Sequence, residues 1–187
     1  ERLVPVPVPQ IVVPDTRKAL AQLAKRFYGC VSEKLSISAV TGTNGKTTTT
    51  YILRSILSSC GKNVGIIGTN EVSYCGKTRA ATLTTPDPIE LHGIFRDMAD
   101  SGVEFLAMEA SAHALALKKL DGISFSSVGF TNFTRDHLDY FGDMEAYGRA
   151  KASLFSKERS RVAVINADDD FGMKLYDERT DAITYGK

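Results

Sequence analysis

The chain has 187 residues, of which 43% are hydrophobic and 24% charged, and its net charge is +1. This length and composition are those of one ordinary globular domain, or of one domain with an appendage. The near-neutral charge and the lack of an apolar run of about 20 residues argue against a nucleic-acid partner and against a membrane partner.

The three cysteines and the two ends of the chain bear on its origin. Cys30, Cys60 and Cys75 are odd in number and lack the spacing of metal ligands, which is typical of reduced thiols in a cytoplasmic protein. No signal peptide is visible, and the first residue is Glu1 rather than Met. The chain also stops directly after an apparent strand. These features favour a segment of a longer protein.

The first part of the chain changes from an extended to a helical pattern. Residues 1–14 alternate proline with valine, which excludes a helix, and residues 11–13 could add an edge strand. Apolar residues from Ala19 to Phe27 then recur at helical spacing, with Asp15 or Thr16 as the N-cap and Gly29 at the end. Because this segment has little apolar surface, we interpret it as the tail of a preceding domain.

From residue 36 onward, strand-like and helical patterns alternate. Strands are predicted over residues 36–40, 64–67, 103–108, 127–131, 161–165 and 183–185, with a β-hairpin over residues 72–82. Helices are predicted over residues 46–60, 88–101, 113–118 and 144–155. This order predicts an α/β fold with a doubly wound, mostly parallel sheet and a short β-hairpin insertion. Ligands of such sheets bind beyond the carboxyl ends of the strands.

The segment AVTGTNGKTTTT, residues 39–50, stands between the first of these strands and its helix. Small residues there let backbone N–H groups close around phosphates, as in P-loop NTPases, and the helix N-terminus favours negative charge. Lys46 would reach the β- and γ-phosphates of a nucleotide, and the Thr47 hydroxyl would bind Mg2+. The usual pattern has glycine where this chain has Val40. The alternative is a Gly/Thr-rich turn that caps an ordinary helix.

Three further residues are candidates for metal chemistry. Glu109 ends a buried strand at the same sheet edge as Thr47, so its carboxylate is well placed for Mg2+, although a helix-capping role is the alternative. His137 lies among aspartates and could bind a metal, but spacing alone favours a surface residue. Lys151 lies in a helix, where a solvent-facing lysine is the default.

Four other polar residues have less specific patterns. Thr84 and Thr85 form a turn before a helix and could bind an anion, but a capped loop explains them equally well. His113 is more typical of a core or capping histidine, and His92 of a surface residue.

Six motifs occur in a fixed order: VTGTNGKTTT, LTTPDP, MEASAHAL, FTNFTRDHLDYFGDMEAY, a helical AK, and VINADDD. Together they resemble the Mur ligase family, and within it the ligases that add the third amino acid of the peptidoglycan stem. The resemblance implies that residues 36–187 are an incomplete central ATPase domain. It also implies that residues 1–35 end an N-terminal UDP-binding domain and linker, and that the C-terminal ligase domain is absent from this sequence.

The resemblance also implies roles for individual residues. Residues that bind ATP would be Gly42, Thr43, Asn44, Gly45, Lys46, Thr47 and Thr48, with Asn166 near the adenine. Catalytic residues would be Lys46, Glu109, His137 and Lys151. One Mg2+ would be held by Thr47 and Glu109, and a second by His137 and by Lys151 as a carbamate. A carbamate replaces the ammonium charge, which is a poor neighbour for Mg2+, with hard oxygen ligands.

The implied substrates are ATP, UDP-N-acetylmuramoyl-L-alanyl-D-glutamate and a diamino acid, either L-lysine or meso-diaminopimelate. Contacts to the UDP-muramoyl-dipeptide would come from Thr84, Thr85, Ser111 and Lys119. The family often has a second serine, a glutamine and an arginine where this chain has Ala112, Leu117 and Lys119. These differences make the substrate contacts less certain than the ATP contacts.

The implied reaction forms an amide bond through an acyl phosphate, in a protein that we expect to be a monomer. A folylpolyglutamate or cyanophycin synthetase is an alternative within the superfamily. A nucleotide-switch module and an ATP-binding fragment without ligase activity are alternatives outside it.

Overall fold

The computed structural model describes residue 5 and residues 7–187. Their strands form one eight-stranded sheet in the order β4-β3-β2-β5-β1-β6-β7-β8. The strands are β1 Ser36–Thr41, β2 Val64–Ile67, β3 Glu71–Tyr74, β4 Lys77–Ala80, β5 Phe105–Glu109, β6 Phe125–Phe130, β7 Ser160–Asn166 and β8 Ile183–Tyr185. All pairs are parallel except β2–β3 and β3–β4, which confirms the doubly wound sheet with a hairpin insertion.

Helices connect the parallel strands. They are α1 Thr16–Phe27, α2 Lys46–Ser59, α3 Pro88–Asp100, α4 Ala112–Ala116, α5 Leu138–Phe141, α6 Met144–Ala152 and α7 Asp170–Glu178, with short 3-10 helices at Val31–Lys34 and Ser153–Phe155. The order of β1, β2 and β5 explains the central position of β1. The chain leaves β1 for β2, returns to place β5 beside β1, and then continues on the other side with β6.

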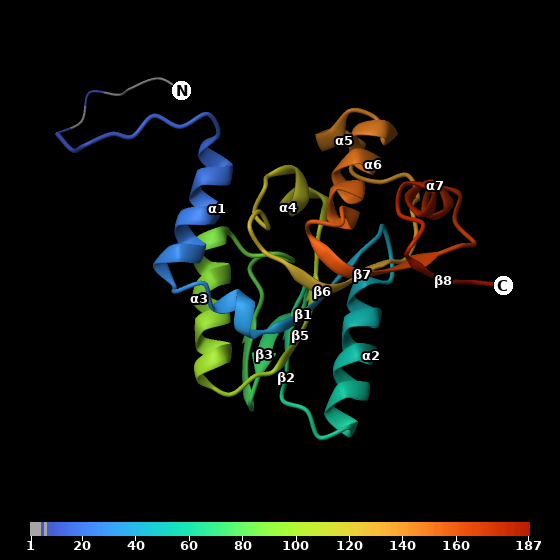
Figure 1. Ribbon diagram of the computed structural model, residues 1–187, viewed down its shortest axis with the longest axis horizontal. Helices are drawn as coiled ribbons and strands as arrows, with labels where there is room; N and C mark the ends of the chain where they lie inside the picture. Colours follow the sequence, from blue (N-terminus) through green and yellow to red (C-terminus); the bar gives the residue numbers. More distant parts are fainter. Residues whose placement is uncertain (1–4, 6) are drawn as a thin grey trace.

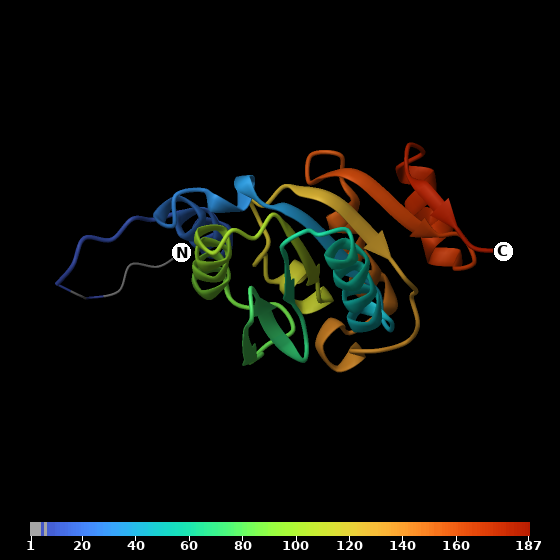
Figure 2. The same ribbon diagram turned by 90° about the horizontal axis from the view of Figure 1, so that it is seen from below.

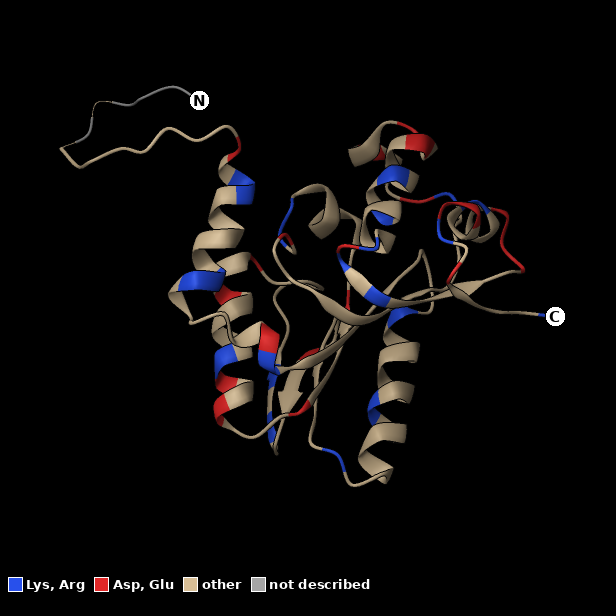
Figure 3. Cartoon of the chain, viewed as in Figure 1, with Lys and Arg blue, Asp and Glu red and all other residues tan. Residues whose placement is uncertain are grey.

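The sheet has its largest core on the face that α3 covers. Ile37 and Ala39 of β1 pack there in one cluster with Leu91, Phe95 and Met98 of α3. Alternate residues of β1 point to the other face, where α2 packs. Figure 3 shows that α2 is nearly free of charged residues, with Lys46 at its start and Arg54 in its middle. Among the described residues, no helix is long and apolar enough to cross a membrane.

α1 lies beside α3 at the end of the molecule opposite the C-terminus (Figures 1 and 2). Asp15 caps α1 by accepting a hydrogen bond from Lys18 N, and Gly29 follows its end with φ +77°, as predicted. The prediction of a possible edge strand at residues 11–13 is wrong. These residues pair with no strand, because the extended segment leads away from the sheet at the start of α1 (Figures 1 and 2), and Ile11 and Val13 line a hollow beside that helix.

The histidine of α3 corrects a second prediction. His92 is fully buried rather than exposed, and its ring meets Phe95 edge-on at 5.4 Å. The prediction failed because α3 is covered on two sides, by the sheet and by α1. Burial and, to a lesser extent, the positive charge of Lys25 together lower the pKa of His92 to about 4.

Several boundaries also differ from prediction. The hairpin turns at Cys75 and Gly76, both with positive φ, and its second strand ends at Ala80 rather than at residue 82. The predicted helix over residues 144–155 ends as α6 at Ala152 and continues as a 3-10 turn. The helices α5 and α7 were not predicted. Both are short, and each begins in a run of charged and polar residues with little apolar periodicity.

Candidate active site

The loop after β1 has the backbone of a phosphate-binding loop. Gly42 has φ +153°, and a Cβ built on it would lie 1.9 Å from Thr131 Oγ1, so no larger residue fits. Gly45, with φ +85°, directly precedes α2. Lys46 is the first residue of α2, and its ammonium folds back over the loop to donate to Gly42 O at 3.0 Å and Thr43 O at 2.9 Å. The chain thus brings a cation and the helix N-terminus to one place.

The segment after β6 holds this loop in shape. Asn44 N donates to Asn132 Oδ1 at 2.9 Å, and Thr131 Oγ1 donates to Asn44 O at 2.6 Å. On the other side, Thr43 Oγ1 accepts from Thr134 N at 3.0 Å. The loop conformation is therefore fixed by the protein itself.

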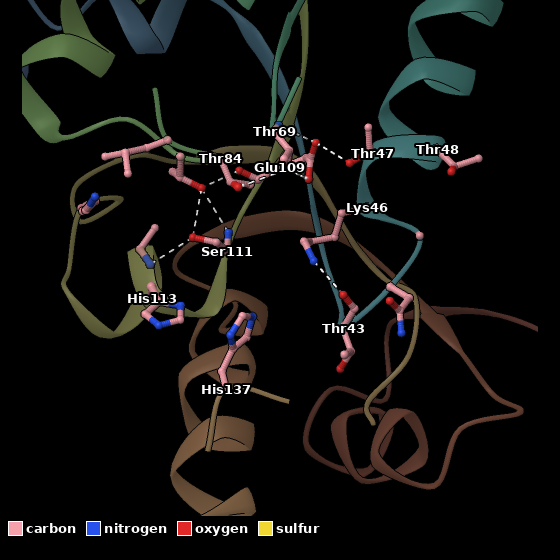
Figure 4. A pocket seen from close by; sticks show the side chains of 16 residues that line it. Thr43, Lys46, Thr47, Thr48, Thr69, Thr84, Glu109, Ser111, His113 and His137 are labelled. Carbon is pink, nitrogen blue, oxygen red and sulfur yellow. Dashed lines mark hydrogen bonds between the residues drawn. The ribbon is translucent and has the colours of Figure 1, made fainter. Parts of the chain in front are cut away.

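Glu109 lies at the end of β5, level with Val40 of β1. Its side chain is only 1% exposed. Its carboxylate accepts from Thr47 Oγ1 at 2.8 Å, from Thr69 N at 2.9 Å and from Thr69 Oγ1 at 3.0 Å. Figure 4 shows Glu109 between Thr47 and Thr69 at one side of the cavity. The prediction that Glu109 and Thr47 meet at one sheet edge is confirmed.

His137 reaches the same cavity from the segment before α5. Its backbone is left-handed at φ 53°, and its Nε2 lies 3.4 Å from Asp136 Oδ2. His113 of α4 stands beside it, with the two ring centres 4.8 Å apart (Figure 4). Burial lowers the pKa of His113, and the charge of His137 lowers it further. His113 was expected in the core or at a cap, but its ring lines the cavity.

Lys151 is buried, so the default expectation of a solvent-facing lysine is wrong. Its residue is 1% exposed, and Nζ lies 4.4 Å from the centre of the Tyr147 ring. Burial, the largest cause, and the positive charge of Lys46 lower the pKa of Lys151, Asp136 opposes them, and the net result is a pKa of about 7. α6 packs against α4 and α5, and this packing buries the side chain of Lys151. At neutral pH a large fraction of Lys151 is therefore an uncharged amine.

The expected substrate contacts lie on the side of α4. Thr85 is buried, and its hydroxyl donates to Glu109 O at 2.9 Å and accepts from Ser111 N at 3.1 Å. Ser111 Oγ accepts from Ala114 N, which caps α4. Lys119 forms an ion pair with Asp87 at 2.8 Å. Thr85 and Ser111 thus already stabilise the backbone around Glu109.

One cavity of about 500 Å³ collects most of the predicted site residues. Gly42, Lys151 and Asn166 do not line it, and Asn166 uses its amide to donate to Thr131 O at 2.8 Å and to accept from Asp168 N at 3.0 Å. Residues in the lining that the sequence reasoning missed are Thr69, Leu83, His113 and Ala114. Thr69 had a signal, because it follows a strand, β2, whose residues pair with β5 up to Met108.

Comparison with known protein families identifies the family to which this chain belongs. Residues 40–187 match the Mur ligase middle domain. The chain belongs to the Mur ligase family. The matched range begins at Val40 and contains the whole phosphate loop, Glu109, His137 and Lys151.

Curated relatives of this Mur ligase chain share its whole length. The chain is 44% identical over 195 residues to the UDP-N-acetylmuramoyl-L-alanyl-D-glutamate–2,6-diaminopimelate ligase of Geobacillus thermodenitrificans. This match covers 100% of the chain and 40% of the relative. The chain is 43% identical over 188 residues to the protein of the same name from Aquifex aeolicus, covering 100% and 39%. The chain therefore spans about 40% of the length of these relatives.

Solved structures with a similar fold include a ligase of the same name. A structure titled as UDP-N-acetylmuramoyl-L-alanyl-D-glutamate–2,6-diaminopimelate ligase matches with a TM-score of 0.81 and 33% identity, over 93% of this chain and 36% of that chain. A Mycobacterium tuberculosis folylpolyglutamate synthase, crystallised with ADP and AMPPCP, matches with a TM-score of 0.69 at 16% identity, over 90% and 46%. The second likeness is one of fold alone.

The oxygen donors of this Mur ligase middle domain suit Mg2+. Thr47 and Glu109 present hard oxygen atoms beside the phosphate loop, as P-loop sites do, where phosphates and water complete the coordination. Within the described residues, no three side chains of His, Cys, Asp or Glu converge on one point.

Proposed function

We propose that the chain is the nucleotide-binding part of an ATP-dependent ligase that joins a diamino acid to UDP-N-acetylmuramoyl-L-alanyl-D-glutamate. The observation that carries this proposal is the contact of Thr47 with Glu109 beside the loop that Lys46 closes, at the head of one cavity. The names of the relatives favour meso-diaminopimelate over L-lysine. Because the chain spans only part of those relatives, their activity is an inference for this protein.

In the proposed reaction, an oxygen of the substrate carboxylate bonds to the γ-phosphorus of ATP while the bond from that phosphorus to the ADP oxygen breaks. Lys46 supplies positive charge where negative charge spreads over the transferred phosphoryl group. The amine of the diamino acid then attacks the carbonyl carbon of the acyl phosphate, loses a proton and expels phosphate. Activation is needed because an unmodified carboxylate oxygen is a poor leaving group.

The metal sites in this proposal follow the donor chemistry. Thr47 and Glu109 would hold one Mg2+, which supplies charge neutralisation for the phosphates. His137 would hold a second, together with Lys151 in the carbamate form. The uncharged amine of Lys151 supports that modification, because only the neutral nitrogen forms a bond to CO2, with loss of one proton.

The proposed substrate contacts are Thr84, Thr85, Ser111 and Lys119, which line the cavity on the side away from the phosphate loop. Asn166 remains a predicted neighbour of the adenine. The domain boundary at residue 35 and a monomeric state likewise remain predictions.

Two measurements on the 187-residue chain test the proposal. The first is calorimetric titration with AMPPNP and Mg2+, in wild type and in Lys46→Ala. Loss of a charged hydrogen-bond donor should weaken binding by about 10- to 100-fold. Lys62→Ala, at the far end of α2, is the matched control and should bind as wild type does. Equal binding of GMPPNP and AMPPNP would instead favour a nucleotide switch.

The second measurement is phosphate release from ATP. Because the chain spans about 40% of the length of its relatives, we expect release by the 187-residue chain alone to be weak or absent. Any release should require both UDP-N-acetylmuramoyl-L-alanyl-D-glutamate and a diamino acid, with meso-diaminopimelate giving more than L-lysine. Release stimulated by a folate and glutamate would favour a folylpolyglutamate synthetase. Nucleotide binding without release under any of these conditions would identify the chain on its own as a non-catalytic ATP-binding unit.

A further inference from the structure

Thr69 has a contact with Glu109 that the family comparison and the sequence motifs do not assign. It follows β2 at the carboxyl edge of the sheet and gives Glu109 two hydrogen bonds, from N to Oε1 at 2.9 Å and from Oγ1 to Oε2 at 3.0 Å. The backbone before it is pressed against the same carboxylate, because a Cβ built on Gly68 would lie 2.3 Å from Glu109 Oε1. Residues 68 and 69 therefore form a fitted support for this side chain.

Counting lone pairs shows what this support does. An ionised carboxylate accepts about four hydrogen bonds, two at each oxygen. Oε1 of Glu109 already accepts from Thr47 Oγ1 and from Thr69 N, so both of its positions are used. Within the part of the chain that the structure describes, Oε2 accepts only from Thr69 Oγ1. One position therefore stays open, on Oε2.

The direction of the Thr69 hydroxyl follows from the same count. A carboxylate only accepts, so the single Thr69 hydroxyl proton is committed to Glu109. Thr84 Oγ1 lies 3.1 Å from Thr69 Oγ1, and Thr84 must then be the donor of that pair. The contacts therefore run from Thr84 through Thr69 to Glu109, and Figure 4 shows these three residues next to one another.

We propose that Thr69 is a positioning residue that fixes the rotation of the Glu109 carboxylate and leaves Oε2 as the oxygen available to a divalent cation. This inference rests on the proposed function, since it requires that Mg2+ binds beside the phosphate loop. A freely rotating carboxylate would offer either oxygen and lose rotational freedom on binding the ion. A fixed carboxylate has already lost that freedom.

The test is the Mg2+ dependence of nucleotide binding in Thr69→Val, which keeps the shape of the side chain and removes the hydroxyl. We expect the Mg2+ concentration for half-maximal AMPPNP binding to rise about tenfold, the typical effect of one hydrogen bond to a charged group. Binding of AMPPNP in EDTA should not change. Thr69→Ser retains the hydroxyl and should restore the wild-type Mg2+ dependence.

Controls separate this role from a structural one. Thr78→Val, at an exposed position of β4, should match wild type in every measurement. Thr69→Ala gives a second variant without the methyl groups of valine, and thermal unfolding shows whether each variant is folded. An unchanged Mg2+ dependence in both variants overturns the inference, and so does an equal loss of binding with and without Mg2+. If wild type itself shows no Mg2+-dependent binding, the proposed function fails first, which is a distinguishable result.

Discussion

At the scale of single residues, the site depends on groups that the fold moves away from their ordinary chemistry. Lys151 is the clearest case, because a lysine in solution is a cation at neutral pH, whereas the pKa of this one is lowered to about 7. Glu109 is a buried carboxylate that three hydrogen bonds stabilise. Sequence spacing gave no reason to treat Lys151 as special, since the packing of α6 against α4 decides its burial.

The state of Lys151 leads to a prediction about CO2. With 13C-labelled bicarbonate, the wild-type chain should give a carbamate carbon signal by NMR. Because the folded pKa is about 7, below the ordinary value of 10.5, the reactive amine becomes more abundant as pH rises through 7. The signal should therefore be strong at pH 8 and weak at pH 6. Lys151→Gln should lack it, whereas Lys157→Gln, an exposed neighbour, should retain it. Identical spectra from both variants would contradict the prediction.

At the scale of elements, the phosphate loop is shaped by a segment far away in sequence. Gly42 touches Thr131 so closely that any side chain would displace one of the two. The sequence pattern predicted that the loop needs glycines, but it did not identify Thr131 and Asn132 as the residues that hold it. Their contribution depends on the pairing of β6 with β1, which no local sequence pattern predicts.

Gly42→Ala should therefore reduce nucleotide binding at least about tenfold and cost about 1–3 kcal/mol of unfolding free energy, because strain and collision act together. The comparison is Gly61→Ala at the end of α2. Gly61 also has a positive φ, +73°, but an added Cβ meets nothing within 4 Å. That variant should lose about 1 kcal/mol of stability and bind AMPPNP normally. Normal binding by Gly42→Ala would show that the loop can adopt another productive shape.

At the scale of the whole molecule, the sequence predicted a mostly parallel sheet with a hairpin insertion, but it did not predict how the outer helices pack. Alternating strands and helices with a Gly-rich turn predicted the parallel sheet and the edge at which ligands gather. They did not predict that α1 covers α3, because α1 has an ordinary amphipathic pattern that any partner could satisfy. As a result, the burial of His92 was missed.

His92 makes the contact of α1 with α3 sensitive to acid. Neither of its ring nitrogens has a hydrogen-bond partner among the described residues, and its folded pKa of about 4 lies below the unfolded value of 6.5. The unfolded chain therefore binds more protons between these pH values, so stability is full above about pH 6.5 and falls as pH decreases towards 4. The loss from this group alone is on the order of 3 kcal/mol.

Replacement of this histidine by leucine should remove that part of the pH dependence. Urea unfolding of wild type and His92→Leu at pH 7.5 and 5.0 gives the difference directly. We expect the variant to lose less stability than wild type on acidification and to be at least as stable at pH 7.5, since an unpaired buried polar group is removed. Parallel losses in the two proteins would exclude His92 as the acid-sensitive group.

The register of β5 against β1 gives the molecule a built-in safeguard. Successive residues of a strand face opposite sides, so a slip of one residue would turn the acidic group at the end of β5 away from the phosphate loop and bury it against apolar helices. A misaligned sheet could not retain a partly working centre. Misaligned copies of this chain should therefore lack a carboxylate beside the phosphate loop.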